Sequence, residues 1–223
     1  MRFLAVMAMS LVLAGEYARS QTTNMTVSTA TNATPALAKA GDEKAWSFSL
    51  SAYTYIVADS REYVQPTVTA DRDWLHVEGR YNYEALNTGS AWLGCNFSGG
   101  EKLAWEFTPM LGGVFGDTSG VAPGYKGSLG WWKLELYSEG EYVRAVDDRS
   151  GTFFYTWSEL TMAPVDWFHF GMVVQRTKLY ETEFDIQRGL LAGFTFKKVD
   201  FTAYVFNPDA SRPTIVLELA FSF

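Results

Sequence analysis

The sequence is poor in the residues that build disulfides, metal centres and catalytic sites. Of its 223 residues one is cysteine, Cys95, and two are histidine, His76 and His169. A single cysteine excludes an intramolecular disulfide and a thiolate metal site. Two histidines more than ninety residues apart make a weak case for zinc. We therefore expect no metal and no cofactor.

Basic clusters and long apolar runs are also missing. Lys and Arg total 18 against 25 Asp and Glu, which gives a formal net charge of −7. Without a cluster of positive charge to neutralise phosphates, nucleic acid is excluded as a partner. After residue 20 no stretch reaches the ~18 consecutive apolar residues that a transmembrane helix needs. No segment has the pattern of a helix of ten or more residues, so a βαβ fold is excluded as well.

The N-terminus has the pattern of an export signal. Arg2 is followed by an apolar stretch, Phe3 to Ala14, that is too short for a stable membrane helix, and Ala18 and Ser20 place small residues before Gln21. This pattern predicts a secretory signal peptide over residues 1–20; the alternative is a membrane anchor. Residues 21–44 are rich in Thr, Asn and Ala without periodicity, which predicts a flexible periplasmic arm. The remaining domain is residues 45–223.

From Trp46 onward the chain alternates between apolar and polar residues. In the last segment Ile215, Leu217 and Leu219 share one face, and Glu218 lies on the other. Period two is typical of half-buried strands, and the short Gly-, Asn-, Asp- and Ser-rich links between the segments predict antiparallel hairpins. We count about twelve strands, with ten as the alternative. Most links are short; the exception is the Gly-rich segment from Gly112 to Gly130, which we interpret as a long link. We assign separate strands around residues 132–136 and 141–147, and we interpret Ser138 to Glu141 as a turn.

Many alternating strands fit either a soluble sandwich or barrel, or a transmembrane barrel whose apolar face meets lipid. The aromatic residues distinguish these, because Trp residues recur where the odd strands begin and Phe residues end the last strand. A sandwich has no reason to gather Trp at one end, whereas a membrane barrel carries an aromatic girdle at the interface. We predict an all-β fold, a closed antiparallel up-and-down transmembrane β-barrel. The predicted girdle is Trp46, Trp74, Trp105, Trp167, Phe221 and Phe223.

The terminal strand also carries a resemblance. IVLELAFSF, with alternating apolar residues and a final Phe223, resembles the C-terminal signature of bacterial outer-membrane β-barrels. The resemblance covers the predicted signal peptide and residues 45–223 as architecture and only the last ten residues as a motif, and it indicates no subfamily. It implies an outer-membrane location, contact with outer-membrane lipid, and recognition of the last strand by the barrel assembly machinery.

The polar faces of the strands are the candidate functional surface. Acidic residues outnumber basic ones there, and a water-filled lumen with such walls favours cations. This predicts a narrow passive channel for small cationic or neutral solutes. The alternative is a non-conducting barrel of structural or assembly role, filled by its own side chains, with Glu106, Lys133, Glu135 and Arg144 paired in a ladder across neighbouring strands. The predicted lumen residues are Glu78, Arg80, Glu106, Lys133, Glu135, Arg144, Glu159 and Glu218.

An enzyme of lipase or protease type is a further alternative. A Ser–His nucleophile needs a base within hydrogen-bond reach and a third group that orients it. His76 and His169 have no flanking Ser in a Gly-rich turn, and no G-x-S-x-G motif is present. We therefore assign no catalytic residue.

Overall fold

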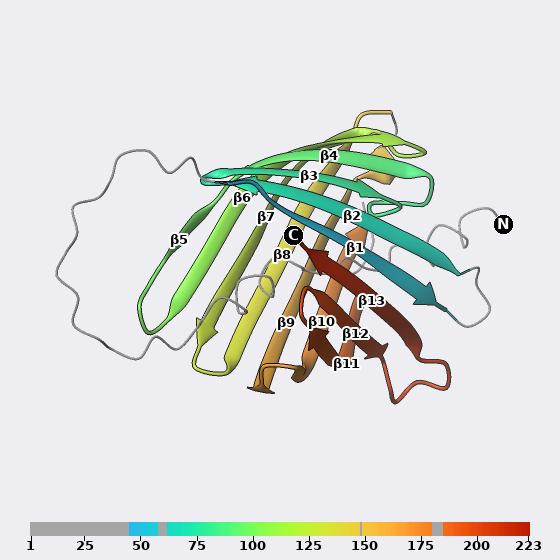
Figure 1. Cartoon of the computed structure of the whole chain (residues 1–223). Coiled ribbons are helices and arrows are strands. Elements are labelled where there is room, and N and C mark those ends of the chain that lie inside the picture. The colour runs from blue at the N-terminus through green and yellow to red at the C-terminus, as the bar shows by residue number, and fades with distance from the viewer. Residues whose placement is uncertain (1–44, 58–61, 148, 180–184) are drawn as a thin grey trace, which may run out of the picture.

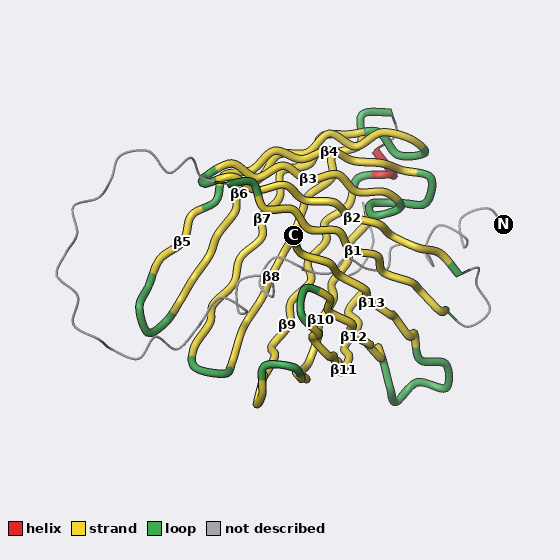
Figure 2. The backbone as a smooth tube through the Cα atoms, viewed as in Figure 1, coloured by secondary structure: helices red, strands yellow, loops and turns green. Residues whose placement is uncertain are grey.

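The computed structural model describes residues 45–57, 62–147, 149–179 and 185–223. The predicted signal peptide, residues 1–20, and the predicted periplasmic arm, residues 21–44, lie outside these described residues and stay predictions. The described residues form β-strands and one short 3-10 turn, η1 (Arg149–Gly151) (Figure 2). In these ranges no helix is long and apolar enough to cross a membrane.

The strands form one closed antiparallel barrel (Figure 1). The circle closes because β1 pairs with β13, from Ser49 opposite Ser222 to Ile56 opposite Ile215. β4 and β5 pair with successive parts of β6, so together they make one wall strand, interrupted at Asn96. Within the described ranges the wall therefore has twelve strands, which confirms the predicted fold. The bounds are β1 (Ser47–Ile56), β2 (Tyr63–Arg72), β3 (Leu75–Tyr81), β4 (Thr88–Cys95), β5 (Phe97–Gly99), β6 (Ala104–Gly116), β7 (Gly120–Trp131), β8 (Leu134–Ala145), β9 (Phe153–Val165), β10 (Phe168–Leu179), β11 (Asp185–Phe196), β12 (Val199–Phe206) and β13 (Thr214–Ser222).

The alternation in the sequence separates the inside of the barrel from the outside. On β13, Val216 and Glu218 are buried in the interior, whereas Ile215 and Leu219 lie on the outer surface with 38% and 40% exposure. Large exposed apolar side chains recur on the outward face of most strands. A continuous apolar outer belt around a polar interior is the inverse of a water-soluble barrel, and it suits a wall that faces lipid.

Six of the eight tryptophans lie exposed at the rim where β1 begins and β13 ends. The four that were predicted for a girdle share this rim with Phe221 and Phe223, and Trp131 and Trp132 at the β7–β8 turn join them. Phe223 is held in place because its backbone N–H donates to the Phe48 carbonyl over 2.9 Å. This backbone hydrogen bond ties Phe223, the residue after β13, to β1 at the aromatic rim.

The two rims differ in the length of their links. At the aromatic rim, β2–β3, β7–β8, β9–β10 and β11–β12 are joined by two residues each, and Asp73, Trp132 and Lys197 in three of these turns have positive φ. Tight hairpins need such left-handed residues. At the opposite rim the links are longer, as at residues 82–87, 146–152 and 207–213. Short turns on one side and longer loops on the other are typical of outer-membrane barrels, with the short turns in the periplasm.

The predicted strand count was right although two assignments were wrong. The segment from Gly112 to Gly130 is not a link, since it contains the end of β6 and nearly all of β7. Conversely, the segments around 132–136 and 141–147, taken as two strands, belong to the single strand β8. Ser138 to Glu141, interpreted as a turn, lie in the middle of β8, where Glu139 and Glu141 point inward and are buried.

Candidate functional site: the lumen

The structure places four of the eight predicted lumen residues in the interior as buried groups. Glu78, Arg80, Glu159 and Glu218 are each at most 7% exposed. Glu106 and Glu135 share the inward phase of β6 and β8 and are half-buried.

The other two predicted lumen residues lie elsewhere. Lys133 is in the exposed β7–β8 turn, where its Nζ donates to the Pro164 carbonyl. Arg144 is on the outer face of β8, opposite in phase to the buried Val143. The expected ladder of Glu106, Lys133, Glu135 and Arg144 is therefore wrong, because Glu135 and Arg144 lie on one strand and the two cations are outside the lumen.

The lumen contains two clusters of side chains, which we call the charged half and the aromatic half. The charged half comes from β3, β4, β7, β8 and the link 82–87, and the aromatic half from β1, β2, β9, β12 and β13. The charged half is His76, Glu78, Arg80, Tyr83, Glu84, Trp92, Lys126, Tyr137, Glu139 and Glu141. The aromatic half is Tyr53, Tyr55, Tyr63, Trp157, Glu159, Tyr204, Phe206 and Glu218.

Glu78 on β3 is the centre of the charged half. It accepts hydrogen bonds from the Arg80 Nε and from Lys126 Nζ, and its Oε2 lies 3.1 Å from His76 Nε2. Lys126 is on β7, and two wall strands separate β3 from β7. This ion pair therefore crosses the interior instead of following the wall.

Arg80 makes a second crossing. Its Nη1 donates to Glu141 Oε2 on β8 over 3.1 Å, and its guanidinium carbon lies 3.8 Å from the Tyr83 ring centroid and 4.5 Å from that of Trp92. A planar guanidinium suits such stacking and pairing, which an ammonium cannot reproduce. Arg80 therefore joins β3, β4, β8 and the link that carries Tyr83.

The link 82–87 turns its side chains into the interior. Tyr83 and Glu84 are 8% and 7% exposed although they are not in a strand. The Tyr83 hydroxyl donates to Glu139 Oε1 over 2.8 Å, and the Tyr137 hydroxyl donates to Glu139 Oε2 over the same distance. The link thus lies against the wall formed by β8.

Four further buried lumen residues were not predicted from the sequence: Lys126, Glu139, Glu141 and Glu84. The first three sit in the segments that were taken for a link or a turn. Their phase was nevertheless visible: Val121, Pro123, Tyr125, Leu129 and Trp131 alternate with Gly, Ala, Lys and Ser across β7. No local pattern indicates that the link carrying Glu84 folds inward.

The charged half leaves several carboxylate oxygens without partners. Both oxygens of Glu84 and Oε1 of Glu141 are buried, and no hydrogen bond reaches them. Burying an ionised carboxylate without a counter-charge is unfavourable. The charge in this half is therefore not balanced by the side chains alone.

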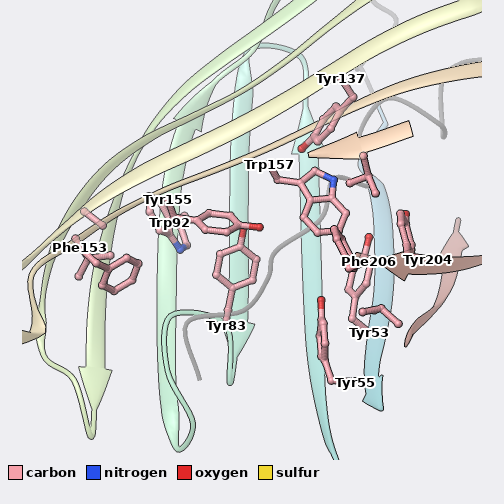
Figure 3. Packing of buried hydrophobic residues seen from close by; sticks show 14 of the residues in the cluster. Tyr53, Tyr55, Tyr83, Trp92, Tyr137, Phe153, Tyr155, Trp157, Tyr204 and Phe206 are labelled. Atoms are coloured by element: carbon pink, nitrogen blue, oxygen red, sulfur yellow. The ribbon is translucent and has the colours of Figure 1, made fainter. Parts of the chain in front are cut away.

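The aromatic half is arranged differently. Tyr53 and Tyr204 each donate from the hydroxyl to one oxygen of Glu218, both over 2.6 Å, so this carboxylate has two short partners. Trp157 donates from Nε1 to Glu159 over 2.9 Å, and its ring packs edge-on against Tyr204 and Phe206 at centroid distances of 5.5 and 5.3 Å. Figure 3 shows these rings together in the interior.

These aromatic contacts also cross the lumen. Trp157 is on β9 and Phe206 on β12, with two wall strands between them. Tyr55, Trp157, Tyr204 and Phe206 have no measurable exposure. At the level of these residues, side chains from strands that are not neighbours in the wall meet in the interior.

Both histidines contact buried polar groups. His76 Nδ1 lies 2.8 Å from Asp71 Oδ1, and its other nitrogen faces Glu78. His169 Nε2 lies 3.1 Å from Thr202 Oγ1, but Thr202 is fully buried and donates to Asp200 over 2.9 Å. In the described ranges no group of three or more His, Cys, Asp or Glu is placed to hold a metal ion.

Comparison with solved structures gives the same architecture. The barrel is similar to a KdgM porin, with 9% identity, a TM-score of 0.56, and coverage of 78% of this chain and 99% of that one. A KdgM porin in complex with disordered oligogalacturonate matches with the same values. The crystal structure of Pseudomonas aeruginosa OpdQ matches at 10% identity and TM-score 0.42, over 76% of this chain and 59% of that one.

No protein-family model and no curated protein sequence matches the chain. The similarity to porins is therefore one of fold. Together with the apolar outer belt, it bears out the outer-membrane barrel that the terminal strand indicated. The chain has the fold of the bacterial outer-membrane porins.

Proposed function

We propose that the barrel is a narrow passive channel for small cationic or neutral solutes. The observation that carries this proposal is the surplus of negative charge inside it. Among the described residues eight acidic side chains are buried, against two basic ones, Arg80 and Lys126. The acidic set is Asp71, Glu78, Glu84, Glu139, Glu141, Glu159, Asp200 and Glu218.

A surplus of this kind is hard to explain as packing alone. A barrel that only filled its interior would be more stable with balanced or apolar side chains, because each unpaired buried charge carries a desolvation penalty. Carboxylates that line a path for water and cations are compensated by those ions instead. Rings of acidic side chains are one of the ways in which pores select cations.

The same charge argues against anionic solutes. One structural neighbour is a porin in complex with oligogalacturonate, which is an anionic oligosaccharide. A lumen with eight buried acidic groups would repel such a chain, so the shared fold does not extend to a shared solute.

Single-channel conductance of the refolded mature protein in a planar bilayer, with a salt gradient across it, tests the proposal. We expect small discrete steps and a reversal potential on the cation-selective side. Glu106→Gln and Glu135→Gln remove half-buried inward charges and should reduce that preference. Arg144→Gln, on the outer face, is the matched control and should leave it unchanged. A folded barrel with anion preference would overturn the proposal.

The second candidate is a non-conducting barrel of structural or assembly role. It is favoured by the aromatic half, where rings from the non-adjacent strands β9 and β12 meet without solvent exposure. The same bilayer experiment separates the two, because a correctly folded barrel that shows no conductance steps at any voltage supports this second role.

We also propose that the barrel assembly machinery reads the last strand. Phe223 is 63% exposed at the aromatic rim, so its side chain is available to a partner. Phe223→Ala should lower the amount of folded barrel in the outer membrane without changing the stability of barrel refolded in vitro. Equal amounts of membrane-inserted variant and parent would contradict this.

A further inference from the structure

The charged half contains carboxylate oxygens that are buried and unsatisfied. Glu84 is 93% buried, since its exposure is 7%, and neither of its oxygens has a hydrogen bond. Glu141 is 4% exposed; its Oε2 accepts from Arg80, and its Oε1 has no partner. Buried polar atoms in folded proteins are nearly always paired, so each exception indicates a missing group.

Arg80 links the surroundings of the two carboxylates. Its Nη1 donates to Glu141 Oε2 over 3.1 Å, and its guanidinium carbon lies 3.8 Å from the ring centroid of Tyr83, the residue before Glu84. Two buried carboxylates with unsatisfied oxygens therefore lie in one region of the lumen. The Trp92 ring centroid is 4.5 Å from the same guanidinium carbon, and Trp92 Nε1 donates to Ser90 Oγ over 2.9 Å, which places a hydroxyl oxygen in this region.

The local charge balance indicates the charge of the missing group. The charged half contains Glu78, Glu84, Glu139 and Glu141 against Arg80 and Lys126, so two negative charges are left over when His76 is neutral. The donor atoms are carboxylate and hydroxyl oxygens, which are the ligands of hard cations. One divalent cation supplies the charge that the side chains lack.

We propose that Glu84 and Glu141, with Ser90 beside them, bind a hard divalent cation inside the lumen. The site has two carboxylates and no third His, Cys, Asp or Glu in ligating position within the described ranges, so the remaining ligands are water and binding is weak. Weak binding suits a site on a permeation path, which must be easy to enter and to leave. The inference deepens the proposed channel function and rests on it for access of the cation from bulk water.

Calcium binding to the refolded barrel in detergent tests this, by isothermal titration with Ca²⁺ as the probe. We expect one Ca²⁺ per barrel with a dissociation constant on the order of 10⁻⁴–10⁻³ M, the range of weak oxygen-ligand sites. Glu84→Gln and Glu141→Gln should each weaken binding about tenfold or more, because affinity follows the number of ligand charges. Glu218→Gln is the matched control: this lumen carboxylate has both oxygens occupied by tyrosine hydroxyls, and its variant should bind Ca²⁺ like the parent.

The unfolding temperature, measured with Ca²⁺ and with chelator, distinguishes loss of the binding site from a defect in folding. Ca²⁺ should raise the unfolding temperature of the parent but not of Glu84→Gln, while in chelator Glu84→Gln should be at least as stable as the parent. The site would be overturned if the parent did not bind Ca²⁺, or if Glu84→Gln and Glu141→Gln both bound Ca²⁺ as the parent does. Protons would then be the occupants of these carboxylate oxygens. Calcium binding without conductance would overturn the proposed channel and support the cation site. Conductance without calcium binding would support the channel and overturn the cation site.

Discussion

The charged half and the aromatic half of the lumen fill the same barrel by different chemistry. In the charged half long side chains from β3, β7 and β8 pair across the interior, and carboxylate oxygens remain unsatisfied. In the aromatic half stiff rings pack edge to face, and Glu218 takes both of its hydroxyl donors from tyrosines on the flanking strands β1 and β12. Glu139 in the charged half can be compared directly with Glu218, because its carboxylate also accepts hydrogen bonds from two tyrosine hydroxyls.

The two halves differ in their effect on the lumen: one determines its shape and the other its charge. Rings with two rotatable bonds lose little entropy on packing and leave no room for water, so the aromatic half narrows the barrel without creating a field. The charged half creates the field, because its carboxylates outnumber its cations. We infer that the aromatic half determines the size of the conductance. The charged half determines whether cations or anions are preferred.

Arg80→Met should have the largest effect, because it leaves Glu78 and Glu141 without their shared cation. Breaking a buried ion pair on one side is destabilising by about 3–5 kcal/mol, and the stacking on Tyr83 and Trp92 is lost as well. Urea unfolding of the barrel in lipid vesicles measures this. Arg144→Met on the outer face is the control and should change the stability by less than about 1 kcal/mol. If both variants matched the parent, Arg80 would not hold the charged half together.

Trp157→Ala should break the aromatic half with a loss of about 3 kcal/mol, the lower end for truncation of a buried aromatic, since the neighbouring rings can relax into the gap. Its effect on transport should differ from that of Arg80→Met. Conductance should rise with unchanged ion preference, whereas Arg80→Met should shift the preference further toward cations. Trp167→Ala, at the exposed rim, is the matched control. A change of ion preference in Trp157→Ala would contradict the division between shape and charge.

The strand pattern predicts which residues face the interior from the barrel wall, but it does not predict the contacts across the interior. Alternation placed Glu78, Glu159 and Glu218 inside because phase is a property of one strand. The strand β7 was not predicted because its glycines were taken as loop residues. A Cβ atom at Gly112 on β6 or Gly124 on β7 would come within 2.5 Å or 3.0 Å of the Trp92 ring, so both glycines make room for the indole of β4.

The crossing pairs could not be predicted from the strand pattern. Arg80 and Glu141 are 61 residues apart, and their contact depends on the curvature of the closed barrel, on strand register and on side-chain length together. The Arg144 assignment failed for a simpler reason: treating β8 as two strands allowed its phase to be reset, and a one-residue shift moves a side chain to the other face.

Tyr204→Phe should weaken the aromatic half by less than Trp157→Ala. The change removes only the hydroxyl that donates to Glu218 over 2.6 Å, and hydrogen bonds to charged groups contribute about 1.5–3 kcal/mol. Tyr142→Phe, with an outward ring that is 46% exposed, controls for the loss of a hydroxyl. Equal stability of the two variants in the urea assay would mean that Glu218 does not depend on its tyrosine donors.

Glu139→Gln against Glu218→Gln gives the smallest and sharpest contrast. Both carboxylates accept from two tyrosine hydroxyls, so both variants lose the same kind of bond when an amide nitrogen replaces a carboxylate oxygen. They differ in surroundings, because Glu139 lies near Lys126 and Arg80, and the attraction of each of these cations exceeds the repulsion from Glu78. Loss of this attraction should make Glu139→Gln more destabilising than Glu218→Gln in the urea assay, by on the order of 1 kcal/mol. If Glu139→Gln were instead the less damaging variant, the carboxylates around Glu139 would outweigh the two cations.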